Sequence, residues 1–386
     1  MAMQDRLNTT LYTAKPSAIR AFSALAAQTP GCVRLTLGEP DFDTPAPVCR
    51  AAGEALQNGE THYIANTGDP ALREKIAAFE AAHNGMDYAP EEIIVTAGAT
   101  EALFTALFGV LDPGDEVIVP SPAFVLYEQI VNLCRAVYVP LDTAPDGFQI
   151  DGKKLAALIT PKTKAIVLNS PNNPTGCVYD ARSLAAVYDA VRGRDIFVVC
   201  DDVYRQLCYS GEYHSFAEYR DLRPQLLVAQ SFSKPYAMTG WRMGYLLGDR
   251  PVMEKLALVH QFAVVSTPAP FQRAAMAALE YDPAPMLAEY ARRRTYVLGR
   301  LRGMGLPVNE PQGAFYAFPS IEGFSLPSAV FCTRLIREAG VAVTPGFCFG
   351  AEGYIRISYC CAPEQLALGL DRLEGFIRGL RGGDKP

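Results

Sequence analysis

Short apolar runs recur through the middle of the chain, each about the length of a buried β-strand. Helix-like segments separate most of them, and apolar residues recur at helical spacing over Ala99–Val110. Because strand and helix alternate, the pattern predicts an α/β domain with a mostly parallel seven-stranded sheet covered by helices. The predicted strands are Ile93–Ala97, Glu116–Val119, Ala136–Leu141, Ala165–Leu168, Ile196–Cys200, Leu226–Ala229 and Met243–Leu247.

The C-terminal part of the chain has a different pattern. Two helical segments, several Gly/Pro-punctuated stretches and one strand-like run predict a second, smaller α+β domain. We expect the N-terminal segment to about Thr44 to pack with it. The predicted division is therefore a large domain over residues 45–280 and a small domain over residues 1–44 and 281–386. The segments are Pro285–Arg302, Gly303–Pro311, Pro345–Gly353, Tyr354–Ser358 and Pro363–Gly379.

Composition narrows the class of protein. The chain has 386 residues, a net charge of −6 and a pI near 5.4, which argues against a nucleic-acid or anionic-membrane surface. Its four histidines lack metal-ligand spacing, and its ten cysteines include no CxxC, so we expect no metal. Cys200, Cys360 and Cys361 are expected to be small buried side chains in a reducing compartment. Met1–Arg20 has no continuous apolar core of a signal peptide, and no apolar stretch reaches membrane-spanning length. A cytoplasmic protein is expected.

Unusual polar clusters follow five of the predicted strands directly. In open α/β sheets, ligands bind at the carboxyl ends of the strands, so clusters at that edge indicate one shared ligand site. The clusters are Gly98-Ala-Thr100, Pro120-Ser-Pro-Ala-Phe124, Asn169-Ser-Pro-Asn-Asn-Pro-Thr-Gly176, Asp201-Asp-Val-Tyr204 and the segment that holds Lys234.

Lys234 lies between hydroxyl side chains and ahead of Arg242, in Ser231-Phe-Ser-Lys234. One interpretation is a Schiff-base lysine, held near a phosphorylated carbonyl cofactor whose phosphate the serines and Arg242 bind. The alternative is a loop lysine with polar neighbours by chance. The local string leaves both open.

The other clusters each suit part of such a cofactor. Ala99 and Thr100 open a predicted helix whose amides and dipole favour a phosphate, although an ordinary strand-to-helix turn is the alternative. Asp201 ends a buried run, and a buried carboxylate needs a cationic partner such as a protonated pyridine nitrogen. An N-cap or turn role remains open for Asp201 and Asp202.

Four further side chains suit a ligand, and for two of them, Phe124 and Arg356, a structural role is the alternative. Phe124 suits stacking on a planar ring, or simply a place in the core. Asn173 and Tyr204 suit hydrogen bonds to a ring hydroxyl oxygen. Arg356 lies between two isoleucines, where its guanidinium suits a substrate carboxylate or a structural ion pair.

Taken together, these strings resemble the class I/II pyridoxal-phosphate aminotransferases of fold type I, over nearly the whole chain. The most specific are the Asn-Asn-Pro-Thr-Gly string and the Ser-x-Ser-Lys…Gly-Trp-Arg string. In the family's order the chain has Gly38-Glu-Pro-Asp-Phe42, His62-Tyr63…Gly68, Val95-Thr-Ala-Gly-Ala-Thr-Glu-Ala102, Ser170-Pro-Asn-Asn-Pro-Thr-Gly176, Asp201-Asp-Val-Tyr204, Ser231-Phe-Ser-Lys234, Met238-Thr-Gly-Trp-Arg242 and Tyr354-Ile-Arg356.

The resemblance implies a role for each matched residue. Lys234 would bind the cofactor covalently and then move the substrate proton, Asp201 would pair with the pyridine nitrogen, and Tyr204 and Asn173 would contact the phenolic oxygen. Phe124 would stack on the ring, and Arg356, Asn173 and the Gly38 backbone would bind the substrate carboxylate. The implied phosphate ligands are Ala99, Thr100, Ser231, Ser233, Arg242 and, from the partner subunit of a homodimer, Tyr63.

The resemblance also implies the reaction. An L-amino acid would give its amino group to pyridoxal 5'-phosphate, and a 2-oxo acid would then take it from pyridoxamine phosphate. A carbon–sulfur β-lyase on the same fold is the alternative, because the same residues serve both. A cofactor-sensing transcription regulator is disfavoured, since 37 residues precede Gly38 in an acidic chain.

The chain departs from aspartate-specific relatives at two places. It has neither a lysine at Thr100 nor an arginine near Phe262 to bind a side-chain carboxylate. We therefore expect a neutral or broad range of amino donors, rather than a strict preference for aspartate.

Overall fold

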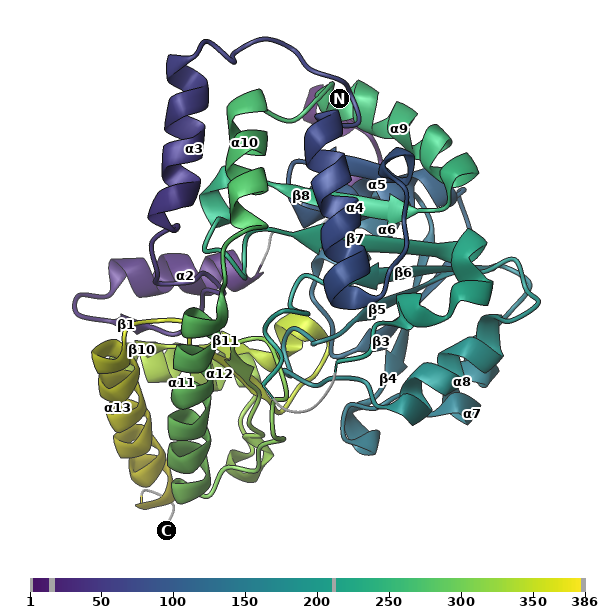
Figure 1. The fold of residues 1–386 in the computed structure, drawn as a ribbon. Coiled ribbons are helices and arrows are strands. Elements are labelled where there is room, and N and C mark those ends of the chain that lie inside the picture. The colour runs from purple at the N-terminus through teal and green to yellow at the C-terminus, as the bar shows by residue number, and fades with distance from the viewer. Residues whose placement is uncertain (1–2, 14–17, 210–212, 383–386) are drawn as a thin grey trace.

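The computed structural model describes residues 3–13, 18–209 and 213–382. A seven-stranded sheet in the order β2-β8-β7-β6-β5-β3-β4 forms the centre of the molecule (Figure 1). All its strands run parallel except β8, which pairs antiparallel with both β2 and β7. The predicted mostly parallel sheet is therefore confirmed.

All seven predicted strands are confirmed, with ends that shift by up to two residues. The strands are β2 (Ile93–Thr96), β3 (Glu116–Ser121), β4 (Val137–Asp142), β5 (Thr163–Asn169), β6 (Phe197–Asp201), β7 (Leu226–Ser231) and β8 (Gly244–Gly248). The polar clusters therefore begin inside or directly after β2, β3, β5, β6 and β7.

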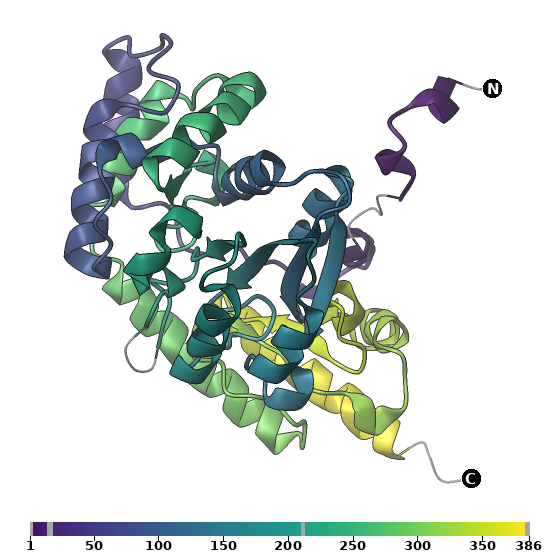
Figure 2. The same ribbon diagram turned by 90° about the vertical axis from the view of Figure 1, so that its right-hand side faces the viewer.

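Helices cover the sheet on both faces, as Figures 1 and 2 show. The helix predicted over Ala99–Val110 is α5, with the same bounds. The other helices of this part of the chain are α3 (Ala46–Gln57), α4 (Pro70–Asn84), α6 (Leu126–Leu133), α7 (Gly152–Leu158), α8 (Ala181–Val191), α9 (Arg250–Val264) and α10 (Ala269–Ala278).

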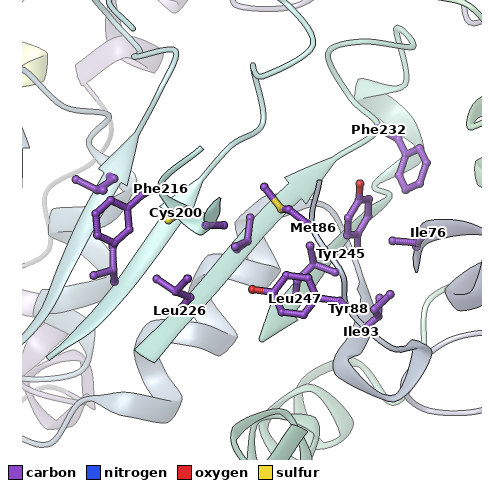
Figure 3. Close-up of a cluster of buried hydrophobic side chains, with 14 of the residues drawn as sticks. Ile76, Met86, Tyr88, Ile93, Cys200, Phe216, Leu226, Phe232, Tyr245 and Leu247 are labelled. Atoms are coloured by element: carbon purple, nitrogen blue, oxygen red, sulfur yellow. The ribbon is translucent and has the colours of Figure 1, made fainter. Parts of the chain in front are cut away.

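The two faces of the sheet belong to different hydrophobic clusters because side chains alternate along a strand. Ile93 and Val95 lie in the cluster that also holds α4 and α8 residues, drawn in part in Figure 3. Ile94 lies in the cluster packed with α5 and α6 residues. A strand buried on both faces needs apolar residues at every position, which is why these strands appear as continuous apolar runs.

A smaller unit is built from the C-terminal helices and two small sheets (Figure 2). Its first sheet pairs β1 with β10, so the N-terminal segment joins it, and Val33 and Leu35 lie in its hydrophobic cluster. The division at residues 45 and 281 stays a prediction, which this pairing supports. The elements are β1 (Val33–Arg34), β9 (Tyr316–Ala317), β10 (Val341–Ala342), β11 (Thr344–Pro345), β12 (Ile355–Ser358), α2 (Ala18–Gln28), α11 (Ala284–Gly303), α12 (Ser328–Arg334) and α13 (Pro363–Gly382). The short helix α1 (Thr10–Thr13) contacts α6 of the larger unit instead.

None of the described helices is long and apolar enough to cross a membrane. Within the same residues, no group of three or more His, Cys, Asp or Glu side chains is arranged to hold a metal ion. The cytoplasmic location stays a prediction.

Candidate active site

The carboxyl ends of β5, β6 and β7 meet beside the smaller unit, around a cavity of about 260 Å³. Every predicted site residue except Tyr63 lines this cavity. They come from both units of the fold: Gly38, Ala99, Thr100, Phe124, Asn173, Asp201, Tyr204, Ser231, Ser233, Lys234, Arg242 and Arg356. Residues that are up to 318 positions apart in the sequence (Gly38 and Arg356) are thus brought together by the fold.

Lys234 lies three residues after the end of β7, partly buried in the cavity wall. Its Nζ donates a hydrogen bond to the carbonyl oxygen of Gly38 at 2.6 Å. Burial lowers the pKa of Lys234 to about 8, against the opposing effect of Cys360 and Glu39. A substantial fraction of the amine is therefore neutral near physiological pH, which is the form that attacks a carbonyl carbon.

Asp201 is the last residue of β6 and only 4% exposed. Its Oδ2 accepts a hydrogen bond from the Tyr127 hydroxyl at 2.6 Å, whereas Oδ1 is buried without a partner among the described residues. Burial raises the pKa of Asp201 to about 6. An unpartnered carboxylate oxygen in this position fits a cationic ring nitrogen, which would satisfy Oδ1 and favour the ionised form.

The N-terminus of α5 forms another part of the cavity wall, through Ala99 and Thr100. Gly98 precedes the helix at φ 78°, a left-handed conformation that favours glycine, and a Cβ there would lie 2.6 Å from Arg242 Nη2. The Arg242 guanidinium donates to the carbonyl oxygen of Thr239 at 2.9 Å. Helix amides, a guanidinium and the hydroxyls of Ser231 and Ser233 together fit a phosphate group.

Arg356 is a buried cation, 3% exposed, in the middle of β12. Its Nη1 donates to Asn173 Oδ1 at 2.7 Å and its Nη2 to the Thr36 carbonyl oxygen at 2.6 Å. Its Nε has no partner, and none of the ion pairs between described residues includes Arg356. The structural ion pair considered above is therefore not found, and a buried guanidinium without a carboxylate suits an incoming anion.

Three polar side chains of the cavity that hydrogen-bond the predicted site residues were not themselves predicted from the sequence. Tyr127 binds Asp201, Tyr316 lies 2.8 Å from the Tyr204 hydroxyl, and Asn169 bonds both the Asp201 carbonyl and the Asn173 amide. Tyr127 lies three residues after Phe124 at the start of α6, a helical spacing that could have identified it. Tyr316 lies in an apolar run that carries no such signal.

Tyr63 lies outside the cavity of its own chain. Its side chain is 88% exposed, in the segment between α3 and α4. Its role at the phosphate of a partner subunit stays a prediction.

The comparisons with known proteins agree with this geometry. The family described as aminotransferase class I and II matches residues 30–373. A probable N-acetyl-LL-diaminopimelate aminotransferase of Bacillus subtilis is 40% identical, over 97% of this chain and 96% of its own length. An aspartate/prephenate aminotransferase of Thermus thermophilus is 41% identical, over 93% of this chain and 95% of its own length.

Solved structures give the same result. Aspartate aminotransferase from Thermus thermophilus with maleate superposes with a TM-score of 0.91 at 38% identity, covering 96% of this chain and 99% of its own. The chain therefore belongs to the class I and II aminotransferases. It is a transaminase that uses pyridoxal phosphate, a cofactor whose ring, when bound, supplies an electron sink beside the reacting carbon.

Proposed function

We propose that this transaminase moves an amino group from neutral, or a broad range of, L-amino acids to 2-oxo acids in two separate half-reactions. The observation that carries the donor range is the charge of the cavity wall. Among described residues, its cations are Lys234, Arg242 and Arg356, and each already has a role. No further cation among the described cavity residues is therefore available to bind a substrate's side-chain carboxylate.

In this proposal Lys234 binds the cofactor and moves the proton at the substrate Cα. Arg356, held by Asn173 and Thr36, orients the α-carboxylate of amino and oxo acids alike. Asp201 holds a positive charge on the cofactor nitrogen. Apolar side chains line the rest of the cavity and suit a neutral substrate side chain: Ile19, Leu37, Leu103 and Leu126.

The names of the relatives do not decide the donor, because they differ. N-acetyl-LL-diaminopimelate, aspartate/prephenate and aromatic amino acids each appear in the name of a relative between 38% and 41% identical. Our proposal therefore depends on the residues of this cavity.

A panel of amino donors tests the proposed range. We expect kcat/KM for aspartate to be no higher than for the preferred neutral donors, because a missing charge-assisted hydrogen bond forfeits about 1.5–3 kcal/mol of selective binding. Thr100→Lys, assayed at saturating cofactor, should raise aspartate relative to alanine or leucine by about 10- to 100-fold. A wild-type kcat/KM for aspartate several hundredfold higher than that for every neutral donor would contradict the proposal.

The requirement for a second substrate separates a transaminase from a carbon–sulfur lyase. We expect parallel lines in double-reciprocal plots of rate against donor at several oxo-acid concentrations, since the two half-reactions share one site. If the enzyme released pyruvate and ammonia from a cysteine conjugate without any oxo acid, at a rate comparable to its transamination rate, the carbon–sulfur lyase would be favoured instead.

We also propose a two-fold dimer whose active sites are shared. The exposed Tyr63 supports it, together with an exposed apolar surface on the packed pair α5 and α9, where Phe108 is 52% and Phe262 84% exposed. A closed dimer would cover this surface and place each Tyr63 near the other chain's cavity.

Mixing Lys234→Ala chains with Tyr63→Ala chains tests the sharing. A hybrid dimer would have one site with both residues intact and one with neither, and random exchange makes about half of all dimers hybrid. Activity should therefore recover to about a quarter of the wild-type value. After verified subunit exchange, activity no greater than the sum of the parents would show that Tyr63 does not act across the dimer.

A further inference from the structure

Tyr316 contacts three parts of the active site at once, although nothing in its local sequence marks it. It begins β9, is 2% exposed and lines the cavity. Its hydroxyl lies 2.8 Å from that of Tyr204, and its ring centroid lies 4.4 Å from the Arg356 guanidinium carbon. A Cβ on Gly38 would lie 1.8 Å from the Tyr316 hydroxyl. Tyr316 therefore also packs closely against Gly38, whose carbonyl oxygen accepts the Lys234 hydrogen bond.

We propose that Tyr316 is a positioning residue with two separable actions. Its hydroxyl strengthens the hydrogen bond that Tyr204 donates to the phenolic oxygen of the cofactor. Its ring holds the Arg356 guanidinium in the plane that receives the substrate carboxylate. The proposal rests on the roles given above to Tyr204 and Arg356.

The first action follows from the number of protons on the hydroxyl pair. Burial raises the pKa of both Tyr204 and Tyr316, the latter to about 12, so both are neutral phenols at physiological pH. Each has one proton to donate. If Tyr204 donates its proton to the cofactor, only Tyr316 can donate within the pair, and accepting that bond makes the Tyr204 hydroxyl a stronger donor.

A stronger bond to the phenolic oxygen has a predictable spectroscopic effect. With the cofactor bound, a negative charge on that oxygen would favour the protonated form of the Lys234 nitrogen. A donated hydrogen bond disperses the charge, so the nitrogen releases its proton at lower pH. Weakening the bond from Tyr204 should therefore raise the pH at which the bound cofactor changes colour.

The second action follows from the surroundings of Arg356. The guanidinium lies between the rings of Tyr316 and Phe349, with centroids at 4.4 and 4.8 Å. Its Nη1 and Nη2 are fixed by Asn173 and Thr36. Two rings and two hydrogen bonds leave the planar fork little freedom to tilt, which is the condition for bidentate binding of a carboxylate.

The experiment compares Tyr316→Phe, Tyr316→Leu, Tyr204→Phe and the double variant Tyr204→Phe/Tyr316→Phe in the cofactor-loaded enzyme. Tyr316→Phe keeps the ring, so KM for amino and oxo acids should stay within about twofold. Its spectral pKa should rise by about 0.5 to 1 unit, in the same direction as Tyr204→Phe and by less. Tyr316→Leu should show this rise and also increase both KM values by about 2- to 30-fold.

The double variant is the decisive measurement, because Tyr316 is proposed to act on the chromophore only through Tyr204. Its spectral pKa should equal that of Tyr204→Phe alone, whereas two independent effects would add. Tyr290→Phe is the matched control, since Tyr290 is buried in the same cluster and its hydroxyl has no partner among the described residues. It should leave both the spectral pKa and KM unchanged.

Four results would overturn the proposal. An unchanged spectral pKa in Tyr316→Phe, or full additivity in the double variant, would remove the action through Tyr204. Unchanged KM values in Tyr316→Leu would remove the action on Arg356. An unchanged spectral pKa in Tyr204→Phe itself would show that Tyr204 does not bond the phenolic oxygen. The proposed transaminase reaction would not fall with it, because the panel of amino donors tests that reaction separately.

Discussion

Replacing Lys234 by alanine is expected to abolish covalent attachment of the cofactor and to lower turnover by about 10⁴-fold or more. The residue supplies both the amine that binds the carbonyl carbon and the base that moves the substrate proton, so one substitution removes two functions. Borohydride reduction and peptide mapping of the wild type should leave the pyridoxyl mass on Lys234. Steady-state turnover and the visible spectrum of the variant complete the measurement.

Lys255→Ala is the matched control, because Lys255 is an exposed lysine on α9 that does not line the cavity. It should retain wild-type turnover. Since burial lowers the pKa of Lys234 to about 8, loading of the cofactor-free protein should also accelerate as pH rises from 7 to 9. A pyridoxyl mass on any other lysine would refute the assignment.

Replacing Asp201 by asparagine is expected to preserve the cavity shape but to lower turnover by about 10²- to 10³-fold. The amide has nearly the same size as the carboxylate, yet it cannot stabilise a positive charge on the ring nitrogen. The loss should appear in kcat at saturating cofactor, with a slower loss of the substrate Cα proton measured by exchange with deuterated solvent.

The pH dependence of cofactor binding gives a second measure of Asp201. Burial raises its pKa to about 6 in the free chain, so the carboxyl becomes neutral as pH falls through that value and no longer pairs with a cation. The affinity of the wild type for the cofactor should therefore decline as pH falls through about 6, and the affinity of Asp201→Asn should not show this decline.

Asp202→Asn controls for the loss of a buried carboxylate in general. Asp202 is also buried, but it accepts a hydrogen bond from Ser215, lies 4.0 Å from Arg205 and does not line the cavity. Asp202→Asn should lower the melting temperature. It should leave kcat at saturating cofactor within about threefold of the wild-type value, because Asp202 does not contact the substrate. Equal losses of kcat in both variants would mean that Asp201 acts only through the fold.

The sequence was a good guide to the sheet because its signal is local. A strand buried on both faces must be apolar at successive positions, so β2 and β7 stood out without any knowledge of their neighbours. Asp201 and Lys234 were identifiable for a similar reason, since each follows a strand that is visibly buried. The boundaries moved by a residue or two because strand ends depend on pairing, as at Ser121 in β3.

The partners of the site residues were much less accessible. Tyr204 and Tyr316 are 112 positions apart, and Asn173 and Arg356 are 183 apart. The sequence therefore left open whether Arg356 belongs to an ion pair. The spacing of Tyr127 from Phe124 could have placed Tyr127 at the cavity, but it could not show that Asp201 is its partner.

By itself, then, the sequence determined which strands have polar clusters at their ends, the residue types that suit a phosphorylated carbonyl cofactor, and the family they resemble. Only the tertiary structure decided that Asp201 has a buried oxygen with no partner among the described residues, and that Arg356 lies between two rings with no carboxylate from those residues beside it. It also decided that Tyr316 connects Tyr204 with Arg356. The physical reason is that apolar periodicity follows from the backbone geometry of neighbouring residues. A side chain's hydrogen-bond partner, by contrast, depends on how distant segments pack against one another.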